Sequence, residues 1–181
     1  MCGYKETRNN GKKLTATMKV NAVKLPLKIK QKTTVLKVSG LANGDSVASW
    51  KSGNTKVVKV SGKPNGTCTL AAGHKKGKTT ITIILKSGLK KKITITVQKA
   101  AVKTSKITGM PKNLKLKKNQ TVTLKAAAAP LTSLQKLKYK SSNKKIVTVT
   151  SKGVIKAKKK GKAVITVQSG SKTVKCKVTV K

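Results

Sequence analysis

Apolar and polar residues alternate along several stretches of the chain. In "KKKITITVQ", residues 90–98, the residues Ile93, Ile95 and Val97 share one face, and "TVKCKVTVK" at 173–181 and "QTVTLKA" at 120–126 repeat the pattern. A period of two predicts strands with one buried face and one solvated face. Turn signals separate such stretches, as in "NGD" at 43–45 and "KSG" at 86–88. No stretch of helical period competes, because Pro130 ends the helix-friendly run "KAAAAPL".

An internal repeat contains most of these strands. "WKSGNTKVVKV" at 50–60 aligns with "YKSSNKKIVTV" at 139–149, and "GHKKGKTTITI" at 73–83 aligns with "KKKGKAVITV" at 158–167. Trp50 aligns with Tyr139, and we expect each ring to fill the middle of its domain as a structural core aromatic. In the Ser-x-Asn that follows, we expect the side chains to turn the chain by satisfying nearby backbone groups.

The alignment covers most of residues 24–181, so it predicts two copies of one domain. Short alternating strands of this kind predict an all-β fold with two tandem β-sandwich domains. We expect an N-terminal segment or leading strand over residues 1–22, a first domain over 23–99 and a second domain over 100–181.

The second copy carries a recognisable order of features. After "LKLKKNQTVTLKAAAAP" at 114–130 come Tyr-x-Ser-x-Asn at 139–143, Gly-x-Ile-x-Ala at 153–157 and a closing Gly-x-x-x-Ile-x-Val at 161–167. This order resembles the bacterial immunoglobulin-like domain, group 2 (BIG2), of intimin- and invasin-type surface protein repeats. The first copy is looser, since it lacks the proline and has Gly53 where the second has Ser142.

The resemblance implies two immunoglobulin-like domains that serve as non-catalytic stalks, spacers or adhesion modules. It also implies a secreted or cell-surface location in bacteria and a larger parent protein. The start, "MCGYKETRNNGKK", has no apolar leader region. We therefore expect either an intracellular protein or a chain whose leader is missing. Cys2 before Gly3 suits the first residue of a processed lipoprotein. No apolar run reaches the length of a transmembrane helix.

Lysine occupies most of the polar positions. The chain carries 44 Lys+Arg against 2 Asp+Glu, a formal net charge of +42, and Arg8 is its only arginine. Such a charge is typical of disordered chains, but the apolar residues, 36% of the total, are ordered in pattern and predict a folded protein. A positive field of this size favours anionic partners, namely nucleic acid, an anionic membrane, a cell-wall polymer or an acidic glycan. A solvated surface without any partner is the alternative.

The lysines occur in short runs, and these are the predicted polyanion-binding residues. The candidates are Lys75, Lys76, Lys90, Lys91, Lys92, Lys158, Lys159 and Lys160. Lys75-Lys76 and Lys158–Lys160 occupy equivalent loops of the two copies, so we expect the same edge of each domain to be charged. Anionic cell-wall polymers such as teichoic acid, or acidic glycans, are the expected partners.

Sequence-independent binding of nucleic acid or another polyanion is the second interpretation. Lysine lacks the planar fork with which arginine reads phosphates and bases. The chain also has no Phe, one Trp and two Tyr for base stacking. We therefore expect only non-specific attraction to nucleic acid.

The sequence offers no set of residues for catalysis or metal binding. Glu6, Asp45 and His74 are scattered, so we expect no catalytic residues, no metal site, no cofactor and no enzyme activity. The cysteines form no C-x-x-C motif. Cys176 is in phase with Val178 and is expected to be a small buried residue. Cys68 is expected to be exposed, with the surrounding ammonium groups favouring its thiolate.

Overall fold

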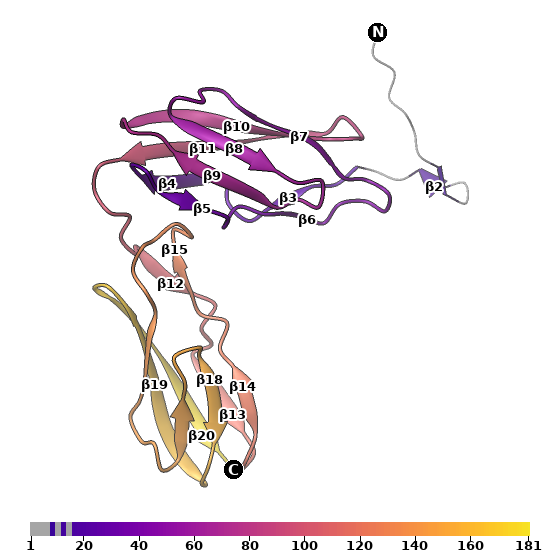
Figure 1. The fold of residues 1–181 in the computed structure, drawn as a ribbon. Coiled ribbons are helices and arrows are strands. Elements are labelled where there is room, and N and C mark those ends of the chain that lie inside the picture. Colours follow the sequence, from indigo (N-terminus) through magenta and orange to yellow (C-terminus); the bar gives the residue numbers. More distant parts are fainter. Residues whose placement is uncertain (1–7, 10–11, 14–15) are drawn as a thin grey trace. The chain divides into compact units, whose positions relative to one another are not determined.

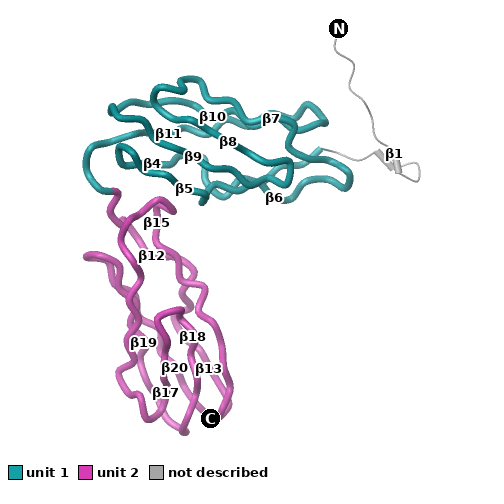
Figure 2. The backbone as a smooth tube through the Cα atoms, viewed as in Figure 1, with its two compact units in different colours: residues 1–101 teal, residues 102–181 magenta. Residues whose placement is uncertain are grey.

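The computed structural model describes residues 8–9, 12–13 and 16–181, with side chains described from residue 16 onward. The chain divides into two compact units, unit 1 (Met1–Ala101) and unit 2 (Val102–Lys181), which are coloured separately in Figure 2. The described residues form strands and no helix, as the ribbon in Figure 1 shows. The predicted all-β fold with two tandem sandwich domains is therefore confirmed.

Unit 1 packs a four-stranded sheet, in the order β4-β11-β10-β7, against a three-stranded sheet, in the order β5-β9-β8. In the first sheet β4 runs parallel to β11, and the other pairs are antiparallel. The strand β3 pairs with β6, so residues 19–20 belong to this unit. The strands are β3 (Lys19–Val20), β4 (Lys24–Lys28), β5 (Lys32–Thr33), β6 (Val38–Ser39), β7 (Val47–Ser52), β8 (Val58–Gly62), β9 (Cys68–Ala72), β10 (Gly77–Leu85) and β11 (Lys90–Gln98), preceded by the paired β1 (Arg8–Asn9) and β2 (Lys12–Lys13).

Unit 2 repeats this arrangement with its own strands. Its sheets have the orders β13-β20-β19-β16 and β14-β18-β17, β13 is parallel to β20, and β12 pairs with β15. The strands are β12 (Lys106–Thr108), β13 (Asn113–Leu116), β14 (Thr121–Thr123), β15 (Ala127–Ala129), β16 (Lys138–Ser141), β17 (Val147–Val149), β18 (Val154–Ala157), β19 (Gly161–Ser169) and β20 (Lys172–Val180). The two units thus share one strand order.

The cores consist of the inward faces that the alternation predicts. In unit 1 the inward side chains of β10 and β11, such as Ile81, Ile83, Ile93 and Ile95, are fully buried. In unit 2 inward residues of β17 to β20 form the corresponding core. Ile93 and Ile95 are buried as predicted, and so are Cys176 and Val178. Burial of such aliphatic side chains, at roughly 25 cal/mol per Å² of apolar surface, is the main stabilising term.

The two aromatic residues do not fill the middle of the sandwiches, which corrects the prediction. Trp50 and Tyr139 point inward, opposite Ile83 and Val167 in the strand register, but both rings are only half-buried. The rings are only half-buried because β7 and β16 are edge strands of their sheets. Each ring therefore packs against the margin of the core. The indole Nε1–H of Trp50 donates to the carbonyl of Lys63, at 3.4 Å.

The Ser-x-Asn turn is confirmed, and its hydrogen bonds are the same in both units. Ser141 Oγ donates to the Val147 carbonyl at 2.6 Å, and Asn143 Oδ1 accepts from the Lys145 N–H at 3.0 Å. In unit 1, Ser52 Oγ donates to the Val58 carbonyl at 2.7 Å. These side chains satisfy backbone groups where the chain crosses from one sheet to the other.

Cys68 is buried, contrary to the prediction. It is 4% exposed on β9, and its thiol lies 3.7 Å from the Leu36 carbonyl. Burial raises the pKa of this thiol to about 11, because a buried thiolate lacks hydration. The expected shift toward thiolate was wrong, since the lysines lie in water while this thiol lies in the core.

Candidate polyanion-binding surface

The predicted lysines in the turns are exposed and occupy equivalent places. Lys75 and Lys76 lie between β9 and β10, and Lys158–Lys160 lie between β18 and β19. Each run therefore directly precedes a long central strand of its four-stranded sheet, β10 in unit 1 and β19 in unit 2.

The third run, on β11, lies elsewhere. Gly77 pairs with Val97 whereas Ile84 pairs with Lys90, so the two ends of the β10–β11 hairpin are seven residues apart. At about 3.3 Å per residue, the turn lysines and the β11 lysines are separated by roughly 23 Å. Within the run, Lys90 and Lys92 face outward, while the half-buried Lys91 donates from Nζ to the Met18 carbonyl at 3.4 Å. The structure does not bring all the unit 1 candidates into one site.

The largest ordered group of lysines is on the outer face of each four-stranded sheet, here called the sheet face. In unit 2, inward residues of β19 and β20 are buried and the alternate positions face solvent. The register places Lys175, Thr166 and Lys140 in one row across three strands. A second row contains Lys115, Thr179 and Lys162.

Unit 1 has a row at the equivalent position of its own sheet face. Thr82 pairs with Lys92 on β11 and with Lys51 on β7, which gives Lys92–Thr82–Lys51. Both units therefore carry a Lys–Thr–Lys row across the strands that correspond by order. The remaining sheet-face lysines are Lys24, Lys28, Lys78 and Lys90 in unit 1, and Lys138 and Lys177 in unit 2.

The threonine between two lysines sets the spacing of the charges. Strands lie about 4.8 Å apart, so ammonium-bearing side chains two strands apart start roughly 9.6 Å from each other. In bulk water two unit charges at that distance repel by only about 0.4 kcal/mol. Two lysines directly opposite each other on adjacent strands would repel more strongly. The sheet can thus carry many lysines without large self-repulsion.

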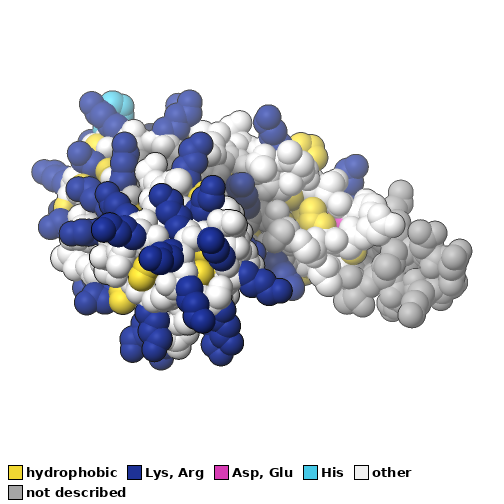
Figure 3. All heavy atoms as spheres, turned by 90° about the horizontal axis from the view of Figure 1, so that it is seen from below, with side chains coloured by type: hydrophobic (Ala, Val, Ile, Leu, Met, Phe, Trp, Pro, Cys, Tyr) yellow, Lys and Arg dark blue, Asp and Glu magenta, His cyan; other side chains and the backbone are white. Residues whose placement is uncertain are grey.

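The described acidic side chain does not neutralise these lysines. Asp45, the acid within residues 16–181, accepts hydrogen bonds from Ser46 N–H at 2.9 Å and Ser87 Oγ at 2.7 Å. It fixes the loop before β7 to the β10–β11 turn. Figure 3 shows lysine side chains spread over the visible face, with few hydrophobic side chains between them. The positive charge is therefore open to external anions.

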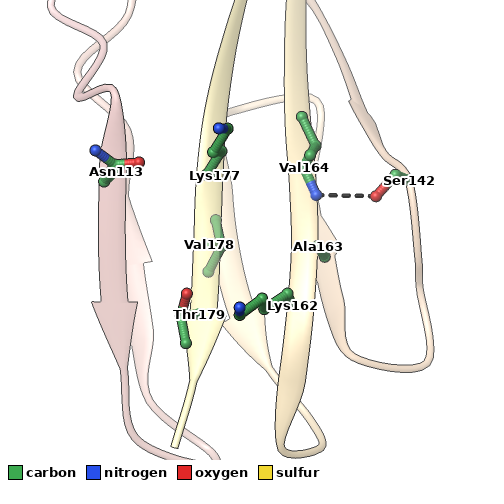
Figure 4. A pocket seen from close by; sticks show the side chains of 8 residues that line it. All are labelled: Asn113, Ser142, Lys162, Ala163, Val164, Lys177, Val178 and Thr179. Atoms are coloured by element: carbon green, nitrogen blue, oxygen red, sulfur yellow. Dashed lines mark hydrogen bonds between the residues drawn. The ribbon is translucent and has the colours of Figure 1, made fainter.

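The outer face of unit 2 also has a shallow depression, with a volume of about 370 Å³. Val164 is one of its lining residues. Val164 pairs with Lys177 on one side, and on the other side its N–H donates to Ser142 Oγ at 2.8 Å. Figure 4 shows these side chains. The lining residues are Asn113, Ser142, Lys162, Ala163, Val164, Lys177, Val178 and Thr179.

Side chains of the types that ligate metal ions are sparse among the described residues. Within residues 16–181 no cluster of three or more His, Cys, Asp or Glu side chains is placed to hold a metal ion. His74 is exposed in the β9–β10 turn. The part of the chain that the structure describes also contains no helix able to cross a membrane.

Reasoning from sequence found Lys90 and Lys92 but missed the other sheet-face lysines, because it followed runs of adjacent lysines. Adjacent residues of a strand point to opposite faces, as Lys91 and Lys92 do, so a run of three divides between them. The useful signal was lysine or threonine at every second position, as in "KCKVT" at 175–179. The register that aligns such positions across strands is not visible in one strand alone.

Comparison with known families agrees with the second copy of the repeat. The model of the bacterial Ig-like domain (group 2) matches residues 101–180. Unit 2 therefore matches that family over nearly its whole length, as the resemblance indicated. Membership of unit 1 in the same family stays a prediction, although its strand order is the same.

Individual proteins with similarity include an enzyme and several surface proteins. The kappa-carrageenase of Pseudoalteromonas carrageenovora is 44% identical over 66 residues, which is 36% of this chain and 17% of the enzyme's length. Domains 5–6 of the S-layer protein SbsC align over 93% of this chain and 98% of theirs, at 20% identity and a TM-score of 0.46. Extracellular cadherin domains 1–4 of protocadherin gamma B7 align over 92% of this chain and 50% of theirs, at 13% identity and a TM-score of 0.36.

Proposed function

We propose that the chain is a non-catalytic structural and adhesive module of a bacterial secreted or cell-surface protein, and that its lysines associate with anionic polymers such as teichoic acid or acidic glycans. The family that unit 2 matches supports the bacterial and structural parts of this proposal. A larger parent protein is part of it, because such a module needs other domains for anchoring. Cys2, the candidate lipoprotein start, lies outside the described residues.

The observation that carries the polymer-binding part is the Lys–Thr–Lys row repeated in both units. The sheet fixes the backbone positions of these lysines two strands apart, so little backbone order is lost when a polymer binds. The exposed lysines of the turns, Lys75, Lys76 and Lys158–Lys160, extend the contact but are carried by less regular backbone. We therefore assign the principal contact to the sheet faces and a supporting one to the turns.

Nucleic acid is the less favoured partner. Residues 16–181 contain no arginine, and their aromatic residues, Trp50 and Tyr139, point toward the cores. Base stacking and base-edge readout therefore have no platform on the described surface. What remains is salt-sensitive attraction to phosphate, which any polycation shows.

Titration calorimetry of the full chain against dextran sulfate, polyphosphate, duplex DNA and neutral dextran tests the proposal. At ~0.15 M salt, where the screening length is ~8 Å, we expect binding to the anionic glycan or polyphosphate that exceeds binding to duplex DNA of equal charge concentration. Neutral dextran is expected not to bind. Equal affinity for all three polyanions would show that the chain binds as a non-specific polycation. No binding to any of them would refute the proposal.

A further inference from the structure

The depression around Val164 differs from the charged surface around it. The outward positions of β19 and β20 are otherwise lysine, threonine or glutamine, and Val164 is the apolar one among them. Lys162 and Lys177 line it, and so do the polar residues Asn113, Ser142 and Thr179. An apolar side chain with a few polar groups around it is the composition of a ligand site.

We propose that this depression binds a sugar unit that carries a sulfate or phosphate ester, as a subsite for one residue of an anionic glycan. The proposal rests on the function proposed above and makes it specific. Lys162 and Lys177 would hold the ester oxygens through charge-assisted hydrogen bonds. The hydroxyl and amide groups would meet the ring hydroxyls, and Val164 would contact an apolar C–H face of the sugar.

The strand register places the two lysines near each other on the sheet face. Lys177 is directly opposite Val164, and Lys162 lies two positions before Val164 on β19, about 6.8 Å along the strand. The two lysines are therefore diagonal cross-strand neighbours, within reach of each other's long side chains. An ester group with several terminal oxygens can accept from both ammonium groups, and it relieves their mutual repulsion.

The hydroxyl of Ser142 has a fixed position on the other side of Val164. Its backbone N–H donates to the Val164 carbonyl at 2.9 Å, and its Oγ accepts from the Val164 N–H at 2.8 Å. The oxygen is thus held by the strand, and its own O–H can donate to a ligand. A preorganised donor costs little entropy on binding.

Unit 1 provides a natural control at the equivalent positions. Thr80 replaces Val164, Thr94 replaces Lys177 and Gly53 replaces Ser142, as the registers of the two sheets show. In unit 1 the residue in the place of Val164 is therefore polar. The ammonium group of Lys177 and the hydroxyl of Ser142 have no counterpart there. We expect this part of unit 1 to bind the sugar ester much more weakly.

Nuclear magnetic resonance titration of the full chain tests the subsite at ~0.15 M salt. The probes are glucose 6-sulfate, glucose 6-phosphate, glucose and inorganic sulfate. We expect at least one ester to cause saturable amide shifts at residues 162–164 and 177–179. The ester that binds more tightly identifies a sulfated or a phosphate-bearing glycan as the source. Inorganic sulfate binding as tightly as both esters would overturn the role of the sugar.

Two pairs of variants separate this site from general charge. Lys162→Gln with Lys177→Gln should weaken ester binding at least tenfold. Lys117→Gln with Lys118→Gln, the same charge loss at exposed positions between β13 and β14, should change it less than twofold. Val164→Phe, which fills the depression without changing charge, should abolish the local shifts, and Thr80→Phe in unit 1 should preserve them.

The outcomes distinguish the subsite from the proposed function. Equal losses in the two lysine pairs, or unchanged binding in Val164→Phe, would overturn the subsite while polymer binding by the whole chain stands. Failure of dextran sulfate and polyphosphate to bind the unmodified chain would overturn the proposed function itself.

Discussion

Removing the hydroxyl of Ser141 should destabilise unit 2 by about 2 kcal/mol. Ser141 is 6% exposed, and its Oγ donates to the Val147 carbonyl at 2.6 Å and accepts from the Asn143 N–H at 3.3 Å. Ser141→Ala loses a hydrogen bond worth about 1 kcal/mol net and leaves a poorly hydrated carbonyl without this partner, which costs about 1–3 kcal/mol. The equivalent Ser52→Ala should cost only about 1 kcal/mol, because Ser52 is half-buried and water can replace its hydroxyl.

Urea denaturation of the full chain measures both changes. The fluorescence of Trp50, the one tryptophan of the chain, reports unit 1, and amide hydrogen exchange of β19 and β20 reports unit 2. With a denaturant slope of about 1.5 kcal/mol per M, a loss of 2 kcal/mol moves the unit 2 midpoint by about 1.3 M. Ser151→Ala, in an exposed turn, is the matched control and should change stability by less than about 0.5 kcal/mol.

Two results would refute this reasoning. A midpoint shift for Ser141→Ala no larger than that of Ser151→Ala would show that the hydroxyl does not hold the edge of the sheet. A larger loss for Ser52→Ala than for Ser141→Ala would show that burial does not set the size of the effect.

Three further predictions follow from single contacts. The buried Oγ1 of Thr79 has no hydrogen-bond partner, so Thr79→Val should stabilise unit 1 by about 1 kcal/mol in Trp fluorescence melts, and destabilisation would contradict this. Gly153 has φ of +78°, and a Cβ there would lie 3.0 Å from Tyr139 Cζ. Gly153→Ala should therefore destabilise unit 2 by about 2 kcal/mol, measured by hydrogen exchange. The pKa of Cys68 is about 11 in the folded protein, against 9.0 for an unperturbed thiol. The thiol of the unfolded chain therefore loses its proton at lower pH, and the contribution of Cys68 to stability falls as the pH rises from 9 to 11. Cys68→Ala should lack this component of the pH dependence, and native Cys68 should react with iodoacetamide more slowly than the unfolded thiol.

The inward faces of the strands were predictable because burial on one side of a sheet imposes a period of two. Ile93, Ile95 and Cys176 follow that period, and all three are buried. The Ser-x-Asn turn was predictable because its hydrogen bonds join residues close together in sequence. Local chemistry and one-dimensional pattern therefore sufficed for these features.

Features that depend on the neighbours of a strand were not predictable. Trp50 and Tyr139 are half-buried because β7 and β16 are edge strands, which their own sequences do not reveal. Cys68 comes shortly after the turn residues "PNG" at 64–66, yet the strand that begins at Cys68 enters the core. The Lys–Thr–Lys rows combine residues from three strands, so they exist only once the register is known.

A comparison of charge-matched variants tests the central claim that the sheet faces hold the anionic polymer. One variant replaces the lysines of the two equivalent rows, Lys51, Lys92, Lys140 and Lys175, with glutamine. The other replaces the turn lysines Lys75, Lys76, Lys158 and Lys159. At ~0.15 M salt, we predict that affinity for dextran sulfate falls at least tenfold in the first variant and less than threefold in the second. Equal losses in both variants would contradict the claim, because binding would then follow total charge alone.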